Sequence, residues 1–309
     1  MILQILMLLA GFAILLKASD YTVKNSIILS RQTGVSQIII GFVFVAIGTS
    51  VPELSIAIVS SLNGHGSLSF GNIIGANVAN LTLIFGTMAI LGLKIEKKRL
   101  IEINQAIIFT AIVSVFIIYS STINAAFGIF LLIIFYAFSR SVVMEEEDIE
   151  KRVHKKHDRK KIAMTAIHLV ASIAAVVIGA EFITNSSIQV AEFLGLGSTM
   201  IGATLLAAGT TIPEFSVGIM ALRRNDVNLA IGDSIGSIVT NITLILGIAS
   251  IINPIHVDAT GRFAAMSLIA ISGIFLLFAS RLKLKKEHGV MLIICYVIFL
   301  YMILSMFAV

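Results

Sequence analysis

The sequence predicts an all-α integral membrane protein with ten transmembrane helices, arranged as two inverted-topology repeats of five. Three observations lead to this prediction: an apolar composition, ten long apolar runs and an internal repeat. Of the 309 residues, 58% are hydrophobic and 13% are charged, whereas soluble domains carry about 25% charged residues. This composition, with a mean hydropathy of +1.02, excludes an ordinary soluble domain. A single cysteine, Cys295, also excludes a disulfide framework within the chain.

Ten apolar runs are long enough for helices that cross the bilayer, because the roughly 30 Å hydrocarbon core takes about 20 residues per helix. The runs cover residues 2–30, 36–62, 70–93, 101–119, 123–143, 162–190, 197–222, 228–254, 263–280 and 288–308. Alternation of polar and apolar residues with period two is weak in all of them. Helices are therefore favoured over the strands of a membrane barrel.

The basic residues predict the orientation of these spans. If the amino terminus is outside, all but one of the 22 Lys and Arg residues lie at the cytoplasmic ends of spans, and Arg262 is the exception. An excess of basic residues in cytoplasmic loops is the positive-inside pattern. We therefore expect a multi-pass protein of the cell membrane with both termini extracellular.

One extended polar segment divides the chain nearly in half. Residues 144–161 carry an acidic run followed by basic residues, and we interpret them as a cytoplasmic linker. Residues 1–143 would then form the first five-helix repeat, and residues 162–309 the second.

The repeat appears when the chain is compared with itself at an offset of 161 residues. GTSVPELS (48–55) aligns with GTTIPEFS (209–216), and GNIIGANVANLTLIFG (71–86) with GDSIGSIVTNITLILG (232–247). Because each copy contains five spans, an odd number, the second copy enters the membrane from the opposite side. Inverted repeats of this kind are typical of secondary transporters, whose substrates bind near mid-membrane.

A proline followed by a glutamate lies in the middle of spans 2 and 7, as Pro52–Glu53 and Pro213–Glu214. Proline removes a backbone donor and interrupts a helix. Each buried acid costs roughly 2.5 to 3.5 kcal/mol on insertion scales, and no Lys or Arg falls near mid-membrane to pair with it. The carboxylates must therefore be protonated or neutralised by a cation from solution.

The polar residues around the two acids all offer oxygen. Hydroxyl residues precede each glutamate by three and four positions, so helical spacing predicts that they share its face. Equivalent amides, and one serine, lie in spans 3 and 8. The set is Thr49, Ser50, Thr210, Thr211, Asn80, Asn241 and Ser237. Oxygen ligands suit hard cations such as Ca²⁺ or Na⁺, and two negative charges match one divalent ion.

Four further polar positions, also paired by the offset, receive other interpretations. Asp20 and Glu181 lie near helix ends, where we expect a gating or packing role above ion ligation. Asn72 and Asp233 stand near the start of spans 3 and 8. Because Asn and Asp are favoured N-cap residues, we expect them to cap these helices.

The motifs GTSVPELS with GNIIGANVAN, and GTTIPEFS with GDSIGSIVTN, resemble the alpha-repeats of the cation/Ca²⁺ antiporter superfamily, particularly the prokaryotic sodium/calcium exchangers. The resemblance implies a Ca²⁺ site made of Glu53, Glu214, Thr49 and Thr210. It implies neighbouring Na⁺ or central positions completed by Ser50, Thr211, Ser237, Asn80 and the main-chain carbonyls of Ala46 and Ala207. It also implies that spans 1 and 6 slide across the other eight to alternate access.

We therefore predict a secondary antiporter that exchanges Ca²⁺ for Na⁺ by alternating access. It would have no enzymatic activity, no cofactor and no nucleic-acid partner, and one chain in the bilayer would suffice. Two alternatives remain open: a Ca²⁺/H⁺ exchanger of the same superfamily and, from a different class, a cation channel. A repeat within one chain argues against the channel, since pores more often form around an axis shared by subunits.

Overall fold

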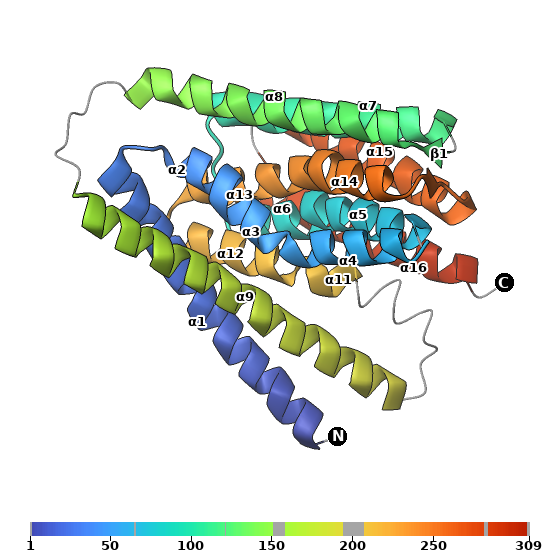
Figure 1. Cartoon of the computed structure of the whole chain (residues 1–309), viewed down its shortest axis with the longest axis horizontal. Helices are drawn as coiled ribbons and strands as arrows, with labels where there is room; N and C mark the ends of the chain where they lie inside the picture. The colour runs from blue at the N-terminus through green and yellow to red at the C-terminus, as the bar shows by residue number, and fades with distance from the viewer. Residues whose placement is uncertain are drawn as a thin grey trace.

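The computed structural model describes residues 2–64, 66–120, 122–150, 158–193, 207–280 and 284–307. Nearly all of these residues are helical, as expected where lipid requires every backbone polar group to be paired within the protein. Two long helices, α1 (Ile2–Thr33) and α9 (Arg159–Phe193), lie side by side along one side of the remaining helices (Figure 1).

Between α1 and α9, the elements are α2 (Gln37–Ile39), η1 (Ile40–Ala46), α3 (Ile47–Thr49), α4 (Val51–Leu62), α5 (Gly66–Ala79), η2 (Asn80–Ile84), α6 (Phe85–Ile90), α7 (Lys97–Ser120), β1 (Thr122–Ile123) and α8 (Ala125–Glu150). After α9 come α11 (Ala207–Thr210), α12 (Ile212–Arg223), α13 (Val227–Val239), η4 (Thr240–Ile245), α14 (Leu246–Ile252), β2 (Ile255–His256), α15 (Ala259–Ser280) and α16 (Lys286–Phe307). The elements labelled η are π-helical segments within longer helices.

Seven helices in the described ranges are long and apolar enough to cross a membrane, or eight if a bent pair counts as one span. This confirms a helical, multi-pass membrane protein. The predicted spans 2–30 and 197–222 are not among the eight, and the second of them includes residues outside the described ranges. The count of ten therefore stays a prediction.

Two of these spans form the centre of the molecule. Gly66–Ile90 and Val227–Ile252 are 83% and 78% buried, whereas the other candidate spans are between 11% and 39% buried. A membrane helix that touches lipid on one side cannot be buried all round. These two helices, which carry the repeated amides, are therefore enclosed by protein rather than by lipid.

Both predicted interruptions are present at the Pro-Glu positions. Gln37–Thr49 and Val51–Leu62 meet at a bend of 45°, with Ser50 between them at φ −82° and ψ 11°. Thr211 interrupts the second copy at φ −86° and ψ −1°, between α11 and α12. Each proline stands at the beginning of the helix that follows, where its missing N–H leaves no hydrogen bond unmade.

Helices α1 and α9 are the longest in the described ranges, with 32 and 35 residues, or about 48 and 52 Å at 1.5 Å per residue. Their axes come close at Gly179, where an added Cβ would lie 3.0 Å from the backbone nitrogen of Leu15. Helix α1 also contacts α12, and α9 contacts α3 and α11. This two-helix layer therefore touches both interrupted helices.

Two glycine contacts are related by the offset of 161 residues. A Cβ added to Gly247 would lie 3.0 Å from the carbonyl oxygen of Gly128. A Cβ added to Gly86 would lie 3.0 Å from the carbonyl oxygen of Gly289. The first contact joins α8 to α14, and the second joins α16 to α6. Each half of the chain thus supplies a helix that packs against the other half.

A short antiparallel pairing joins two connections that the charge pattern predicts on the same side. Strand β1 pairs with β2 so that Thr122 is opposite His256, and the Thr122 hydroxyl lies 3.1 Å from Nδ1 of that histidine. The pairing ties the α7–α8 connection to the α14–α15 connection.

The predicted N-caps differ from the structure, while the predicted linker lies partly outside the described residues. Helix α13 is capped by Asp226, whose carboxylate accepts from the backbone N–H of Leu229 at 3.1 Å. Asp233 and Asn72 lie inside α13 and α5, so the expectation that they cap these helices is wrong. Within the predicted linker, α8 continues to Glu150 and α9 begins at Arg159.

Candidate cation site

Glu53 and Glu214 lie in the first turn of α4 and α12, directly after the two interruptions. Their side chains are 0% and 1% exposed, and the two carboxylates are close enough to interact electrostatically. Neither acid forms an ion pair with a lysine or arginine in the part of the chain that the structure describes. Both oxygens of Glu53 and Oε2 of Glu214 lack a hydrogen-bond partner there.

The hydroxyl groups of each half face the acid of the other half. The Ser50 hydroxyl donates to Oε1 of Glu214 at 3.0 Å, and the Thr49 side chain also lies beside Glu214. The Thr210 side chain lies beside Glu53. The sequence predicted hydroxyls and acid on one helical face, but the interruption at Ser50 turns the chain between them. The site is therefore assembled between the halves.

The two central amides lie where the helices widen. Asn80 is the first residue of η2 and Asn241 the second residue of η4, and both are 1% exposed. Neither side-chain atom of Asn80 has a partner among the described residues, while Nδ2 of Asn241 donates to Oδ1 of Asn77 at 3.2 Å. Single-turn π segments within α-helices occur frequently at functional sites.

The other predicted ligands differ in whether their oxygen atoms already form hydrogen bonds. Ser237 is fully buried, and its hydroxyl has no partner within the described ranges. The Thr211 hydroxyl donates to the Ala208 carbonyl at 2.9 Å. The Ala46 carbonyl accepts from the backbone N–H of Ser50 at 3.1 Å. Ala207 is the first residue of α11.

Three polar residues were not recognised as part of this region. Asp233 is fully buried beside Glu214 and Thr49. Asn72 is 5% exposed and accepts from the Thr210 hydroxyl at 3.4 Å. Asn77 also donates to the Ile238 carbonyl at 3.3 Å. A spacing signal was available, since Asn72 and Asp233 precede the central amides by eight residues and so share their helical faces.

No three His, Cys, Asp or Glu side chains lie in a metal-binding cluster among the described residues. A cation between Glu53 and Glu214 would thus have two carboxylates, and its other ligands would be amide, hydroxyl and main-chain oxygens. Hard cations accept such mixed oxygen sets.

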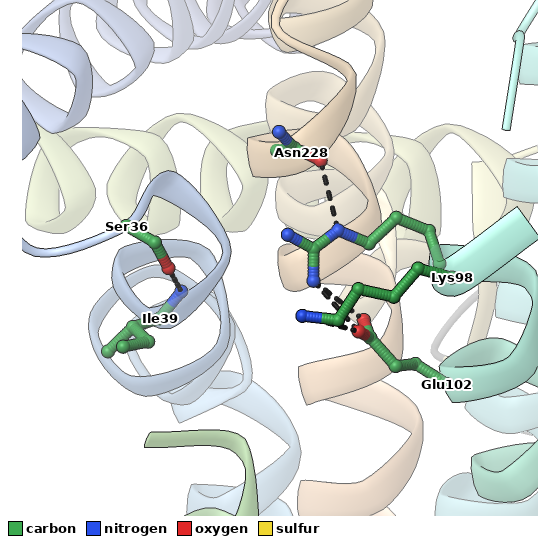
Figure 2. A network of polar contacts seen from close by, with 6 residues as sticks. Ser36, Ile39, Lys98, Glu102 and Asn228 are labelled. Carbon is green, nitrogen blue, oxygen red and sulfur yellow. Dashed lines mark hydrogen bonds and ion pairs between the residues drawn. The ribbon is translucent and has the colours of Figure 1, made fainter. Parts of the chain in front are cut away.

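A polar network lies at the beginning of α13, around Asn228. Arg99 of α7 donates from Nε to Oδ1 of Asn228 at 3.2 Å and from Nη1 to Oε1 of Glu102 at 2.8 Å. Figure 2 shows Glu102 and Asn228 on either side of this guanidinium group, with Lys98 close by. The network fixes the beginning of α13, the helix that carries Asp233 and Ser237.

Asp20 was expected near a helix end, but it lies well inside α1 (Ile2–Thr33) and pairs with a basic residue. Its Oδ1 accepts from Nε of Arg224 at 2.6 Å, at the C-terminal end of α12. The pair connects α1 with the helix of Glu214. The pair favours packing over gating, the two roles that the sequence left open for Asp20 and Glu181, and the side chain of Glu181 lies outside the described residues.

Comparisons with known proteins match nearly the whole chain. The family described as "Sodium/calcium exchanger protein" matches residues 3–143 and 164–305. Sodium/calcium exchanger MaX1 of Methanosarcina acetivorans is 32% identical over 338 residues, covering 96% of this chain and 97% of its own. Inner membrane protein YrbG of Escherichia coli is 26% identical over 303 residues, covering 94% and 93%. The solved structure of the sodium-calcium exchanger NCX_Mj, soaked with Na⁺, gives a TM-score of 0.83 at 26% identity and covers 96% and 97%.

Proposed function

The chain belongs to the sodium/calcium exchanger family, and on that premise we propose that it moves Ca²⁺ across a membrane in exchange for Na⁺ at a site built on Glu53 and Glu214. It is a transporter and not an enzyme. No resident cofactor is needed, because the transported ions themselves supply the positive charge at the site.

One observation carries the assignment of the site: two buried, adjacent carboxylates without a basic partner in the described ranges. Two like charges held close together in a low-dielectric interior repel each other, so both stay ionised only when a cation neutralises them. Ca²⁺ or Na⁺ ions would therefore compete for the same pair. Such competition is what couples the two ions in an antiporter.

The proposed ligand set extends beyond the two acids to oxygen groups of both halves. It comprises Thr49, Ser50, Thr210, Thr211, Asn80, Asn241, Ser237 and the carbonyls of Ala46 and Ala207. The unpartnered oxygens of Asn80, Asn241 and Ser237 support this set, because a buried polar group without a partner costs free energy that ligation of a cation would offset. The Ala46 carbonyl accepts from the Ser50 N–H and also lies 3.3 Å from the Thr49 hydroxyl, so it would bind a cation in place of that hydroxyl.

We further propose ten spans in two inverted five-helix repeats, residues 1–143 and 162–309. The reciprocal glycine contacts α8–α14 and α16–α6 support a pseudo-two-fold relation between the halves. The charge pattern favours both ends of the sequence outside and residues 144–161 in the cytoplasm. Helices α1 and α9, which contact both interrupted helices, would slide as one layer to expose the site to each side in turn.

A Ca²⁺/H⁺ exchanger is not favoured, because the matching family, MaX1 and NCX_Mj are sodium/calcium exchangers. A channel would conduct without a counter-ion and has no support here.

The test is Ca²⁺ uptake into liposomes that contain the purified protein and are loaded with Na⁺. We expect uptake only while an outward Na⁺ gradient exists, and loss of uptake in Glu53→Gln and Glu214→Gln. Glu287→Gln is the matched control, since Glu287 is exposed in the first turn of α16. Ca²⁺ uptake driven by a pH gradient without Na⁺ would refute the assignment of Na⁺ as the counter-ion. Full uptake in Glu53→Gln would refute the assignment of the site to the two glutamates.

A further inference from the structure

Asp233 is a third buried acid next to the proposed site. It lies on α13 four residues before Ser237, is 0% exposed, and has no hydrogen-bond partner for either carboxylate oxygen among the described residues. Its polar neighbours are Glu214 and Thr49. Its Oδ2 faces α12, because a Cβ added at Gly218, one turn after Glu214, would lie 3.9 Å away.

The donor group beside Asp233 is the Thr49 hydroxyl, which already donates within its own helix. The Thr49 hydroxyl has a single hydrogen, and that hydrogen points back to the helix, where Oγ1 lies 3.1 Å from the Val45 carbonyl oxygen. Its lone pairs are thus available to the neighbouring acids. Oε2 of Glu214 has no donor within the described ranges either. Oxygen atoms that meet without a hydrogen between them repel one another unless a cation lies among them.

The equivalent position in the other half is neutral. Under the offset of 161, Asp233 corresponds to Asn72, and Thr49 corresponds to Thr210. Asn72 accepts a hydrogen bond from Thr210 at 3.4 Å, so this contact between the halves is satisfied within the protein. The mirror contact between Thr49 and Asp233 instead carries a formal negative charge. The two ends of the site therefore have the same framework and different charge.

We propose that Asp233 is a cation ligand at the Glu214 end of the site, where Asp233 and Glu214 hold a cation next to the one between Glu53 and Glu214, so that cations bind more tightly at that end. This inference rests on the proposed function, because it takes the glutamate pair as the cation site. The three negative charges of Glu53, Glu214 and Asp233 are neutralised by one Ca²⁺ and one monovalent cation at adjacent positions. The Asn72 end, which lacks the charge, holds its ions more weakly.

The experiment compares Asp233→Asn with the wild-type protein by equilibrium binding of Ca²⁺ and by Na⁺ competition in detergent. Asparagine matches aspartate in shape and already occupies the equivalent position, so the variant is expected to fold. The Coulomb energy between the carboxylate and the ion is proportional to the charge of the ion. Loss of one negative charge should therefore raise the dissociation constant of a divalent ion by the square of the factor by which it raises that of a monovalent ion. We expect dissociation constants to rise about 5-fold for Na⁺ and about 25-fold for Ca²⁺.

Asp258→Asn is the control, because Asp258 is exposed and its side chain caps Gly261, which asparagine also does. The double variant Asn72→Asp with Asp233→Asn restores the total charge, and we expect it to regain most of the Ca²⁺ affinity. If the dissociation constants of Asp233→Asn equalled those of the control variant, the proposal would be overturned, because Asp233 would then be permanently protonated in the wild-type protein. Equal losses for both ions would also overturn it, because they would mean a packing role.

The proposed function fails separately. If the wild-type protein bound Ca²⁺ but showed no Na⁺-driven uptake in liposomes, antiport would be refuted, while the binding comparison would still decide the role of Asp233.

Discussion

The ion pair between Asp20 and Arg224 links the α1–α9 layer to the helix of Glu214, and Asp20→Asn is the change that tests its role. The pair joins Oδ1 of Asp20 to Nε of Arg224 at 2.6 Å and to Nη2 at 2.5 Å. If Asp20 only fastens α1 to α12, its loss changes stability and leaves the affinity for Ca²⁺ unchanged. If Asp20 were an ion ligand, the affinity would fall.

The magnitude follows from the exposure of the two side chains, which is 36% for Arg224 and 40% for Asp20. Exposed ion pairs measured by double-mutant cycles contribute about 0.2–1 kcal/mol. This corresponds to a factor of about 1.4 to 5 in an equilibrium constant, with RT near 0.6 kcal/mol. Salt reduces the contribution, because the Debye length falls from about 10 Å at 0.1 M to about 3 Å at 1 M.

The assay is equilibrium unfolding in detergent for Asp20→Asn, Arg224→Gln and the double variant. Choline chloride serves as the salt, because Na⁺ would bind at the site. We expect a coupling energy of about 0.2–1 kcal/mol at low salt that decreases at 1 M, with the Ca²⁺ dissociation constant unchanged within about twofold. A salt-independent coupling above about 2 kcal/mol, or a tenfold loss of Ca²⁺ affinity in Asp20→Asn, would refute the reasoning.

Three other predictions concern stability. Ser50→Ala removes the buried donor to Glu214 and should lower the unfolding free energy, measured without cations, by about 1.5–3 kcal/mol. The control Ser55→Ala changes an exposed hydroxyl on α4, the helix that follows Ser50, and should alter the unfolding free energy by less than about 0.5 kcal/mol. Burial raises the pKa of Asp226 above 3.8, so the contribution of its carboxyl group to stability falls as pH rises from about 4 through the folded pKa. In a titration of stability against pH, Asp226→Asn should keep the helix cap and remove this pH dependence. Asp226→Ala removes the cap and should lower the unfolding free energy by about 1 kcal/mol. Gly128→Ala places a Cβ 2.7 Å from the Gly247 carbonyl oxygen and should lower the unfolding free energy by about 1–3 kcal/mol. Gly273→Ala, whose Cβ would have nothing within 4 Å, should leave the unfolding free energy unchanged. Equal unfolding midpoints for the two variants would contradict this prediction.

The sequence predicts what depends on composition and on the position of single residues. Within the described ranges the apolar runs coincide with helices, and Pro52 and Pro213 coincide with their interruptions. The burial of Glu53 and Glu214 also follows, because each lies in the middle of an apolar run. These features need no knowledge of which helix packs against which.

The partners of the hydroxyl groups could not be predicted, because helical spacing assumes an unbroken helix. At Ser50 the chain turns, and the hydroxyl reaches Glu214 of the other half. The π segments at Asn80 and Asn241 leave no signature in the spacing of apolar residues. Asp233 was interpreted as a cap because polar residues commonly begin helices, but Asp226 supplies the cap seven residues earlier.

The crossed glycine contacts have a consequence for biosynthesis. Helix α6 ends at Ile90, and its partner α16 begins at Lys286, so ribosomes that add 5–20 residues per second make the partner roughly 10–40 seconds later. During this delay the glycine face of α6 is inserted in the bilayer with no protein against it. Single spans tolerate this, since helices are stable in lipid before they associate. The contact between α6 and α16 therefore forms only after nearly the last helix has been synthesised.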